Sequence, residues 1–360
     1  MIRRYALLFL VGCVFCVVSA CQSRPANLPI PEYPEAAVNR EAEISDEYGE
    51  FFPEALTPPA DLPVSSFGEI WAYLLSDREQ TLKAGYPISD IGYFGAEVDV
   101  YGQLVKVPNR RRISGFSGRV HLVVCCNNTA LTHFVLEPGS AIRKKFIADL
   151  LEAAKPFDGL QIDFEYIPAQ DGAAFRSFLA ELKEGLPSHK MFTIALRART
   201  RPLTNDVYDY RFIAPLVDRI LVMAYDEHWS TSAPGPIASM AWCRAVAAYG
   251  LLTIKPEKLI MGIPFYGRTW GSESTFRAYF HSGIERIKRE NQVTEIRREQ
   301  SIPTFTYEIP LKVTVYYEDE YSLSYRIEMY RAMGVKAIGF WCLGQETPVI
   351  WSLLNLSSPE

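Results

Sequence analysis

The sequence predicts a (β/α)8 TIM barrel, an α/β fold in which eight parallel strands form a closed ring covered by helices. Eight short apolar runs follow one another from Phe67 onward, and amphipathic helical segments lie between them. Apolar strands that alternate with helices indicate a parallel sheet that is buried under a helical layer. The chain of 360 residues is also long enough for a barrel of about 250 residues with additional segments.

The eight predicted strands have the composition of a sheet that is buried on both faces. They span residues 68–75, 88–95, 119–126, 158–165, 191–197, 218–225, 258–266 and 336–342. Eight strand–helix units favour a closed barrel over an open doubly wound sheet.

Three of the helices are predicted by apolar stripes and by signals at their ends. They span residues 140–155, 171–186 and 322–333. Ser140 is positioned to cap the first, and the second ends near Gly185. The third begins at Ser322 and stops at Gly334, because glycine readily adopts the left-handed conformation that ends a helix.

Two segments do not fit this alternation. No helix is predicted within residues 97–118, where residues 99–107 are typical of a small hairpin. Residues 270–312 form an additional, partly basic segment before the eighth strand. We assign the barrel domain to residues 64–358.

The N-terminus has the pattern of an export signal. Two arginines precede an apolar run over residues 5–18, which is shorter than the roughly 20 residues of a membrane-spanning helix. Two small residues and then Cys21 follow, an order that resembles a bacterial lipobox. Residues 1–20 are therefore predicted to be a lipoprotein signal peptide, with the exported protein lipid-anchored at the cell envelope through Cys21. The alternative is a plain signal peptide followed by an incidental cysteine.

Residues 21–63 are rich in proline and acidic residues and lack a sustained apolar period. This composition is typical of a tether between an anchor and a folded domain. The apolar residues within its last part, residues 48–62, are expected to pack on the barrel.

Four cysteines remain in the predicted barrel, namely Cys125, Cys126, Cys243 and Cys342. Cys125 and Cys126 are neighbours on a predicted strand, so their side chains point to opposite faces. The sequence defines no pairing, and we expect buried free thiols.

Charge and residue spacing disfavour several classes of function. The formal net charge is −5, and no stripe of basic and aromatic residues is present, so no nucleic-acid partner is expected. The five histidines are scattered without metal-ligand spacing, and no glycine-rich phosphate loop occurs. We therefore expect neither a metal nor an organic cofactor.

The most informative segment is the fourth predicted strand. Because strand side chains alternate between faces, Gly159, Gln161, Asp163 and Glu165 share the face toward the barrel axis, and the apolar residues between them face the helices. The two carboxyl groups then project the same way at the end of the strand, where barrel enzymes hold their active sites.

Two neighbouring carboxyl groups do not both ionise readily, so one of them keeps its proton to higher pH. Glu165, which is longer and nearer the mouth, is the candidate general acid for a glycosidic oxygen, and Asp163 is the partner that tunes it. A divalent metal site or solvated loop residues are the alternatives. The position of Asp163 inside an apolar run argues against solvated acids, because an unpaired buried charge is costly.

The segment DGLQIDFE resembles the catalytic signature of glycoside hydrolase family 18, the chitinase-like family. Asp158, Asp163 and Glu165 match the signature, while Gln161 stands where chitinases have an aspartate. Further motifs follow in the family's order: Met223-Ala224-Tyr225-Asp226 for strand six, Tyr266-Gly267-Arg268 for strand seven and Gly339-Phe340-Trp341 for strand eight.

This resemblance implies a retaining mechanism in which the acetamido oxygen of the substrate attacks the anomeric carbon. Glu165 would serve as acid and then base, Asp163 would orient the acetamido N–H, and Tyr225 would bind the acetamido oxygen. Substrate contacts or support of the site would come from Asp226, Trp341, Tyr266, Arg268 and Gln161, and the structural part of the motif from Asp158 and Gly159. The amide of Gln161 is expected to donate to Asp163 and hold it ionised.

Departures from the chitinases are similar to the spore-germination or cortex-lytic branch of the family. Strand three carries the run 125–128 in place of Ser-x-Gly-Gly, Phe164 replaces a common tryptophan, and the insertion before strand eight is reduced to residues 270–312. The branch implies an N-acetylglucosaminidase acting first on peptidoglycan or its fragments and second on chitin oligomers. The alternatives are a non-catalytic carbohydrate-binding barrel and an envelope scaffold. The retained Glu165 favours an enzyme.

Overall fold

The computed structural model describes residues 59–271, 278–309 and 311–357. The predicted signal peptide, Cys21 as the predicted site of lipidation, and most of the predicted tether lie outside these residues. Within the described residues, no helix is long and apolar enough to cross a membrane.

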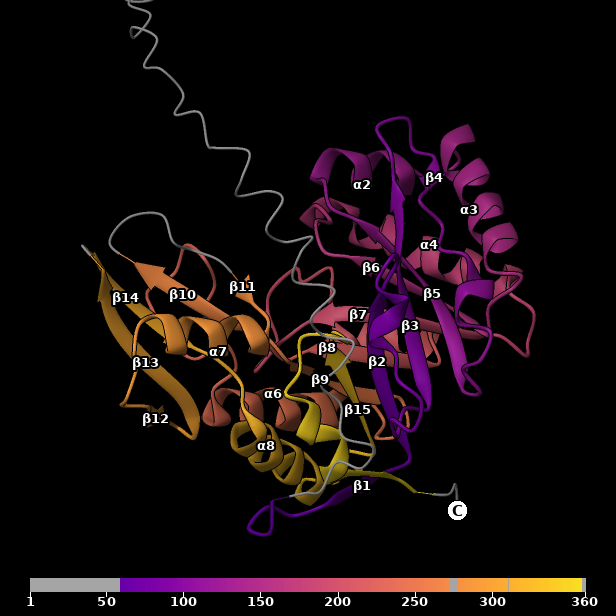
Figure 1. The fold of residues 1–360 in the computed structure, drawn as a ribbon. Coiled ribbons are helices and arrows are strands. Elements are labelled where there is room, and N and C mark those ends of the chain that lie inside the picture. Colours follow the sequence, from indigo (N-terminus) through magenta and orange to yellow (C-terminus); the bar gives the residue numbers. More distant parts are fainter. Residues whose placement is uncertain (1–58, 272–277, 310, 358–360) are drawn as a thin grey trace, which may run out of the picture. The chain divides into compact units, whose positions relative to one another are not determined.

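Eight parallel strands form a closed ring, which confirms the predicted barrel (Figure 1). Around the ring the order is β2, β15, β9, β8, β7, β6, β5 and β3, and β3 pairs with β2 to close it. The strands are β2 (Glu69–Leu75), β3 (Asp90–Val98), β5 (Arg119–Cys126), β6 (Gly159–Phe164), β7 (Met191–Arg197), β8 (Arg219–Met223), β9 (Leu259–Pro264) and β15 (Ala337–Trp341). Each of the eight predicted strands corresponds to one of them.

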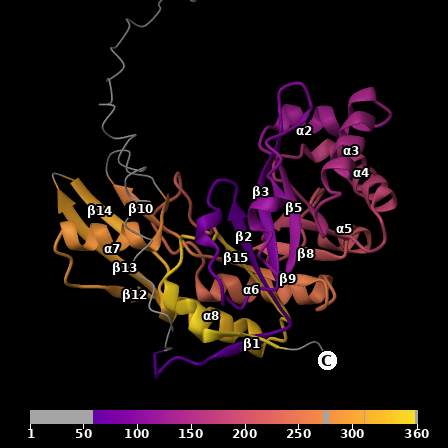
Figure 2. The same ribbon diagram turned by 45° about the vertical axis from the view of Figure 1, so that its right-hand side comes forward.

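Helices connect the strands and cover the ring, as the turned view in Figure 2 also shows. They are α2 (Thr129–Leu136), α3 (Ala141–Ala153), α4 (Gly172–Gly185), α5 (Tyr210–Ile213), α6 (Met240–Thr253) and α8 (Glu320–Ala332). Short 3-10 helices are η2 (Glu79–Thr81), η3 (Arg110–Ile113), η4 (Ala169–Asp171), η5 (Ala214–Leu216) and η6 (Pro348–Leu353).

The ends of the three predicted helices follow from their capping residues. The side chain of Ser140 accepts a hydrogen bond from Arg143 N at the start of α3, as predicted. Helix α8 begins two residues earlier than predicted, because Asp319 is the N-cap and forms a reciprocal capping box with Ser322. Gly334 ends this helix with φ 86°.

The side chains of β6 alternate as predicted. Leu160, Ile162 and Phe164 face the helical layer, where the ring of Phe164 lies 6.4 Å from that of Phe146 and 5.9 Å from that of Phe178. The interior of the ring has a separate core that includes Trp71, Tyr73, Val123, Leu221 and Ile260. The barrel is therefore a packed structure, and the polar residues of β6 point into its axis.

The insertion before the last strand is a small α+β unit over residues 267–316. Its five-stranded sheet has the order β11, β10, β14, β13 and β12. The elements are β10 (Gly267–Gly271), β11 (Ala278–Tyr279), α7 (His281–Glu290), β12 (Arg297–Glu299), β13 (Ile302–Ile309) and β14 (Leu311–Tyr316). It is slightly longer than the predicted 270–312, because β10 starts three residues after β9 and β14 continues almost to α8.

Two smaller pairings complete the described sheets. The predicted hairpin is confirmed: β4 (Leu104–Val105) runs antiparallel to the end of β3. Near the chain ends, β1 (Ser65–Phe67) pairs in parallel with β16 (Leu354–Leu356). Leu62 is buried in the main core, as expected for the end of the segment before the barrel.

Charged residues link the strands at the end of the ring where the strands begin. The buried carboxylate of Asp90 on β3 accepts from Arg119 Nε at 2.7 Å and lies 2.8 Å from His121 Nε2, both on β5. Arg219 on β8 donates to Glu69 on β2 at 2.7 Å. These pairs hold together strands that are far apart in the sequence.

The four cysteines of the barrel are free and buried. This agrees with the expectation of unpaired thiols. Burial raises the pKa of Cys125 to about 12, so its thiol stays protonated and is a poor nucleophile.

Candidate active site

Side chains from several strands meet at the carboxyl ends of the ring. Strand β6 supplies Asp163 and, directly after its last residue, Glu165. Strand β8 leads into Tyr225 and Asp226, and β15 ends on Trp341. Because all these strands run parallel in one closed ring, their carboxyl ends share one mouth.

Asp163 lies at the bottom of this mouth and is almost completely buried, with 6% of its surface exposed. Its Oδ1 atom is buried and has no hydrogen-bond partner among the residues that the structure describes. Burial, reinforced by the nearby charge of Glu165 and opposed by Arg197, raises the pKa of Asp163 to about 8. The residue therefore holds an acceptor that the protein itself does not satisfy.

Glu165 lies further out, and 38% of its side chain is exposed. Burial raises its pKa above the usual value, the positive charge of Arg197 lowers it, and the charge of Asp226 raises it again, for a net increase. Since the pKa values of both carboxyl groups are raised, the pair retains a proton at higher pH than isolated carboxylates. The sequence predicted one retained proton for this pair and assigned it to Glu165, whereas the larger rise in pKa is that of Asp163.

Gln161 differs from the prediction. It is fully buried, its Nε2 donates to Thr193 Oγ1 at 3.1 Å, and its Oε1 accepts from Tyr73 OH at 2.5 Å. The expected hydrogen bond from Gln161 to Asp163 is absent, because both polar ends of the amide are engaged by residues of β7 and β2. Gln161 thus lies beneath the carboxyl pair, with no surface through which to contact a substrate.

Tyr225 approaches its neighbouring strand closely, and a glycine makes this possible. A Cβ added to Gly262 on β9 would lie 3.0 Å from Tyr225 Cε1 and 2.7 Å from the carbonyl oxygen of Val222. Burial raises the pKa of Tyr225 well above its usual value, and the charges of Asp163 and Glu165 add to this effect. The phenol therefore keeps its proton and remains a hydrogen-bond donor.

Asp226 is fixed by the two residues of the predicted Tyr-x-Arg motif. Its Oδ1 accepts from Tyr266 OH at 2.6 Å and from the Nε and Nη2 atoms of Arg268 at 3.0 and 2.8 Å. The backbone of Asp226 has φ 57°, in the left-handed region that non-glycine residues seldom adopt. Three hydrogen bonds to one carboxylate oxygen stabilise a conformation that is otherwise unfavourable.

Trp341 lies at the end of β15, with its ring partly exposed. Its centroid is 5.1 Å from that of Tyr73 and 5.2 Å from that of Phe94. An indole held between two aromatic neighbours offers a fixed flat surface on which a sugar ring can stack.

Asp158 and Gly159 lie at the start of β6, away from the mouth. The side chain of Asp158 accepts from the backbone N–H of Val120 at 2.8 Å. A Cβ at Gly159 would lie 2.3 Å from His121 Nδ1, so only glycine fits there. Both observations agree with the structural role predicted for this part of the motif.

Two residues of the site were missed by the sequence reasoning. Tyr73 points inward from β2 and reaches Gln161, and burial together with the charges of Asp163 and Glu165 raises its pKa well above the usual value. Arg197, the last residue of β7, has its Nε atom 3.8 Å from Glu165 Oε2. The sequence did contain a signal for Arg197, because this arginine ends the predicted strand that follows the strand of Asp163 and Glu165.

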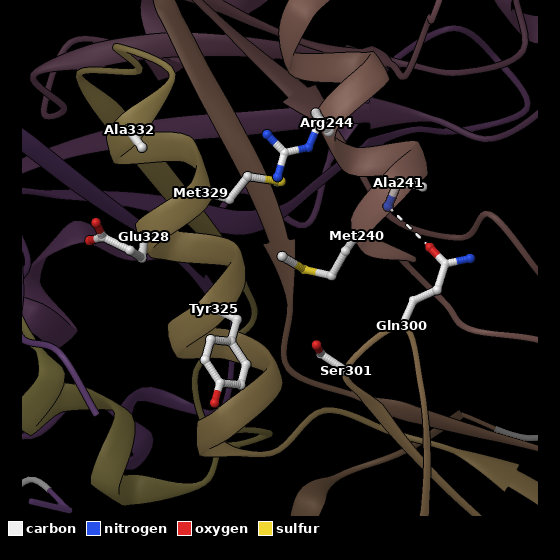
Figure 3. A pocket seen from close by; sticks show the side chains of 9 residues that line it. All are labelled: Met240, Ala241, Arg244, Gln300, Ser301, Tyr325, Glu328, Met329 and Ala332. Atoms are coloured by element: carbon white, nitrogen blue, oxygen red, sulfur yellow. Dashed lines mark hydrogen bonds between the residues drawn. The ribbon is translucent and has the colours of Figure 1, made fainter. Parts of the chain in front are cut away.

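Metal-binding clusters and a cavity outside the mouth were the other candidate sites within the described residues. Within the described residues, no group of three or more His, Cys, Asp or Glu side chains could hold a metal ion. A cavity of about 590 Å³ lies on the outer helical layer between α6, α8 and the turn before β13 (Figure 3). Its lining, which includes Met240, Arg244 and Tyr325, shares no residue with the mouth of the ring.

Comparison with known proteins agrees with this assembly of residues. A model of the glycosyl hydrolases family 18 matches residues 128–346, more than half of the chain. The matched range includes Asp163, Glu165, Tyr225, Asp226 and Trp341.

Two curated relatives come from Bacillus species. An uncharacterized glycosylase, YvbX, from Bacillus subtilis is 29% identical over 59% of this chain and 65% of its own length. A cortical fragment-lytic enzyme from Bacillus anthracis is 24% identical over 73% of this chain and 66% of its own length. The chain thus spans slightly less than two thirds of either relative.

A solved structure supports the fold. The spore cortex-lytic enzyme SleL from Bacillus cereus superposes with a TM-score of 0.71 and 22% sequence identity, covering 81% of this chain and 74% of that one. At this identity the likeness is one of fold.

Proposed function

This chain belongs to family 18 of the glycosyl hydrolases, and on that premise we propose that it hydrolyses β-linked polymers containing N-acetylglucosamine. The mechanism proposed is retaining and substrate-assisted. The observation that supports it most directly is the carboxyl pair at the mouth, in which Asp163 is buried with a free oxygen and Glu165 is accessible with a raised pKa.

In the first step Glu165 donates its proton to the glycosidic oxygen of the leaving sugar. The acetamido oxygen of the retained sugar attacks its own anomeric carbon, so a carbon–oxygen bond forms as the glycosidic bond breaks. No nucleophile from the protein is needed, and the positive charge of the oxazolinium ion lies close to Asp163.

Asp163 prepares this step through its unpaired Oδ1 atom. An acetamido N–H that donates to this oxygen favours the ionised form of Asp163. Since the pair holds one proton between them, ionisation of Asp163 leaves that proton on Glu165, where the reaction requires it. Substrate binding thereby sets the protonation state of the acid.

Tyr225 donates its hydroxyl hydrogen to the acetamido oxygen and aims it at the anomeric carbon, and Trp341 supports the sugar ring. Fixing the attacking atom in this way can lower the barrier by several kcal/mol. Asp226, held by Tyr266 and Arg268, keeps the exit of β8 in the geometry that presents Tyr225.

In the second step Glu165, now ionised, accepts a proton from water. The water oxygen attacks the anomeric carbon from the side that the leaving sugar vacated. The bond between the anomeric carbon and the acetamido oxygen breaks, which restores the acetamido group. Two inversions at the same carbon give overall retention of configuration.

Peptidoglycan or its fragments are the first proposed substrates, and chitin oligomers are the second. Support for the first is the similarity to a protein named a cortical fragment-lytic enzyme, and support for the second is the fold shared with chitinases. A non-catalytic carbohydrate-binding barrel is the alternative function, and retention of Glu165 with a raised pKa favours the hydrolase.

We also propose that the protein is exported and carries lipid on Cys21, with residues 1–20 as the signal, 21–63 as the tether and 64–358 as the barrel. The lipobox-like sequence before Cys21 supports this arrangement. Mass analysis of the N-terminal peptide decides between an acylated Cys21 and an unmodified one.

The test of the function is the Glu165→Gln variant, assayed by mass analysis of products from purified peptidoglycan and from chitin oligomers. We expect turnover to fall by about two to four orders of magnitude, the usual contribution of a general acid. Glu184→Gln on the outer face of α4 is the matched control, and it should keep wild-type activity. Near-normal hydrolysis by Glu165→Gln would remove this residue from the acid role, and no hydrolysis by the wild type would favour the binding barrel.

A further inference from the structure

Arg197 has no role in the mechanism above, yet it lies beside the proposed acid. It is the last residue of β7, the strand next to β6, and its Nε atom is 3.8 Å from Glu165 Oε2. About 42% of its side chain is exposed. Arg197 therefore borders both the carboxyl pair and the solvent at the mouth.

The position of this guanidinium is fixed by aromatic rings. Its Cζ atom lies 5.5 Å from the ring centroid of Tyr166 and 5.8 Å from that of Tyr208. The hydroxyl of Tyr208 accepts from Ile167 N at 3.0 Å, and Tyr210 OH donates to the carbonyl oxygen of Arg197 at 2.7 Å. Cation–π contacts on a held tyrosine orient the cation without using its N–H groups.

The donors of Arg197 are largely unused within the described residues. Its Nε atom is buried and has no hydrogen-bond partner. The 3.8 Å separation from Glu165 is longer than an N–H···O hydrogen bond, which spans about 2.7–3.2 Å. A guanidinium has five N–H donors in a planar fork that matches a carboxylate. Because Nε is buried, the donors that a ligand can reach are those on the terminal nitrogens of this partly exposed side chain.

We propose that Arg197 is a specificity-determining residue that binds a carboxylate on the leaving sugar, as in the lactyl group of N-acetylmuramic acid. This inference rests on the proposed function and names the substrate feature that the site selects. Glu165 protonates the leaving oxygen, so a residue beside Glu165 lies beside the leaving sugar. In a disaccharide of N-acetylglucosamine and N-acetylmuramic acid, that oxygen is O4, and the lactyl carboxylate is attached at the adjacent O3.

Charge distinguishes this substrate from chitin. A chitin oligomer has no anionic group. When Glu165 carries the proton that it donates, such an oligomer would cover the guanidinium of Arg197 without a counter-charge, which is unfavourable. A lactyl carboxylate supplies the missing partner through a charge-assisted pair. Such pairing favours peptidoglycan fragments whose lactyl carboxyl carries no stem peptide over neutral chitin oligomers.

Pairing of Arg197 with a substrate carboxylate would also keep the proton on Glu165. Arg197 lowers the pKa of Glu165 in the free protein, which works against a residue that must carry a proton. A substrate carboxylate on Arg197 offsets this positive charge, so the pKa of Glu165 rises when the anionic sugar is bound. Recognition and protonation of the acid are therefore coupled in the same contact.

The experiment compares kcat/KM for N-acetylglucosaminyl-β-1,4-N-acetylmuramic acid with that for its lactyl methyl ester, which lacks the negative charge and is larger by one methyl group. For the wild type, kcat/KM should be about 10- to 100-fold higher for the disaccharide with the free carboxylate than for its ester, the range expected from a hydrogen bond to a charged group. Arg197→Met should lose this preference, and Arg197→Lys should keep part of it. Arg201→Met, an exposed arginine four residues further along, is the control that should match wild type.

The ratio of acid to ester separates specificity from a structural role. An Arg197→Met variant that loses activity equally on both substrates would overturn the inference, because Arg197 would then only support Glu165. The Arg197→Lys variant guards against misfolding, since it keeps the side-chain stem and the charge.

Carboxylate recognition by Arg197 can be tested even if the protein does not hydrolyse the disaccharide. Calorimetry on Glu165→Gln, with and without Arg197→Met, measures binding of the acid and the ester without turnover. A preference for the acid that disappears with Arg197→Met supports carboxylate recognition whether or not the protein is a hydrolase. Equal affinities for acid and ester, or no binding of either, overturn it.

Discussion

At the scale of single residues, the surroundings of the two carboxyl groups at the mouth raise both of their pKa values. Asp163 is buried with an unpaired oxygen, whereas Glu165 is partly exposed and faces Arg197. The neutral amide of Gln161 lies beneath them, and it neither binds nor releases a proton near neutral pH. Gln161 therefore adds no titratable group to the carboxyl pair.

Replacing Gln161 by aspartate adds a third buried carboxyl group two residues from Asp163. A neighbouring negative charge disfavours ionisation, so the pKa values of Asp163 and Glu165 should rise further. Since activity requires protonated Glu165, the alkaline limb of the kcat/KM profile should move to higher pH. A pH–rate profile of Gln161→Asp that coincides with wild type would count against electrostatic coupling of position 161 to the pair.

At the level of elements, loops and helix ends hold the strand exits in place. The exit of β8 is tied to β10 because Arg268 donates to Asp226. The return from the insertion into the barrel passes through Asp319, which caps α8 and pairs with Arg298 of β12. Glu318 and Arg326, both fully buried, form an ion pair in the same region. The insertion is thus anchored at both of its ends.

The capping role of Asp319 gives a prediction for the stability of α8. Asp319→Ala should lower the free energy of unfolding by about 1–2 kcal/mol, the usual effect of removing an N-cap. Asp319→Asn keeps a capping oxygen and loses only the charge toward Arg298, so it should lose less. Urea unfolding measures both, and an equal loss in the two variants would assign the effect to the ion pair.

At the scale of the whole molecule, hydrogen bonds and buried charges close the ring. The pairing of β2 with β3 completes the barrel, and the Asp90–Arg119–His121 cluster crosses from β3 to β5 at the N-terminal end. Burial alone would raise the pKa of Asp90, but hydrogen bonds from His121 and Arg119 hold it below its usual value.

Asp90→Ala should destabilise the barrel by about 3 kcal/mol at neutral pH, because the remaining partners lose a buried counter-charge. The folded-state pKa of Asp90 is depressed, so its contribution is present above the unfolded pKa, roughly 4, and is lost as the pH falls through the lower folded value. Urea unfolding of wild type and variant should therefore differ at pH 7 and converge under strongly acidic conditions.

The exposed Glu184→Ala is the control for this comparison, since it should unfold like wild type at every pH. A difference between Asp90→Ala and wild type that stays constant down to pH 2 would show that the Asp90 side chain stabilises the ring by packing and not by charge.

By itself, the sequence determined the features that depend on local pattern. The eight strands, the cap at Ser140 and the inward face of Asp163 and Glu165 followed from alternation and helix-end chemistry, because neighbouring positions in the chain fix them. The family motifs placed Tyr225 and Trp341 at strand ends for the same reason.

Only the tertiary structure decided which distant side chains meet. Gln161 bonds Tyr73 from 88 residues away, so its expected contact with Asp163 does not form. Arg197 reaches Glu165 because β7 lies beside β6 in a given register, and Asp226 adopts its unusual backbone because Arg268 holds it. Such contacts depend on the closure and register of the ring, which local periodicity does not specify.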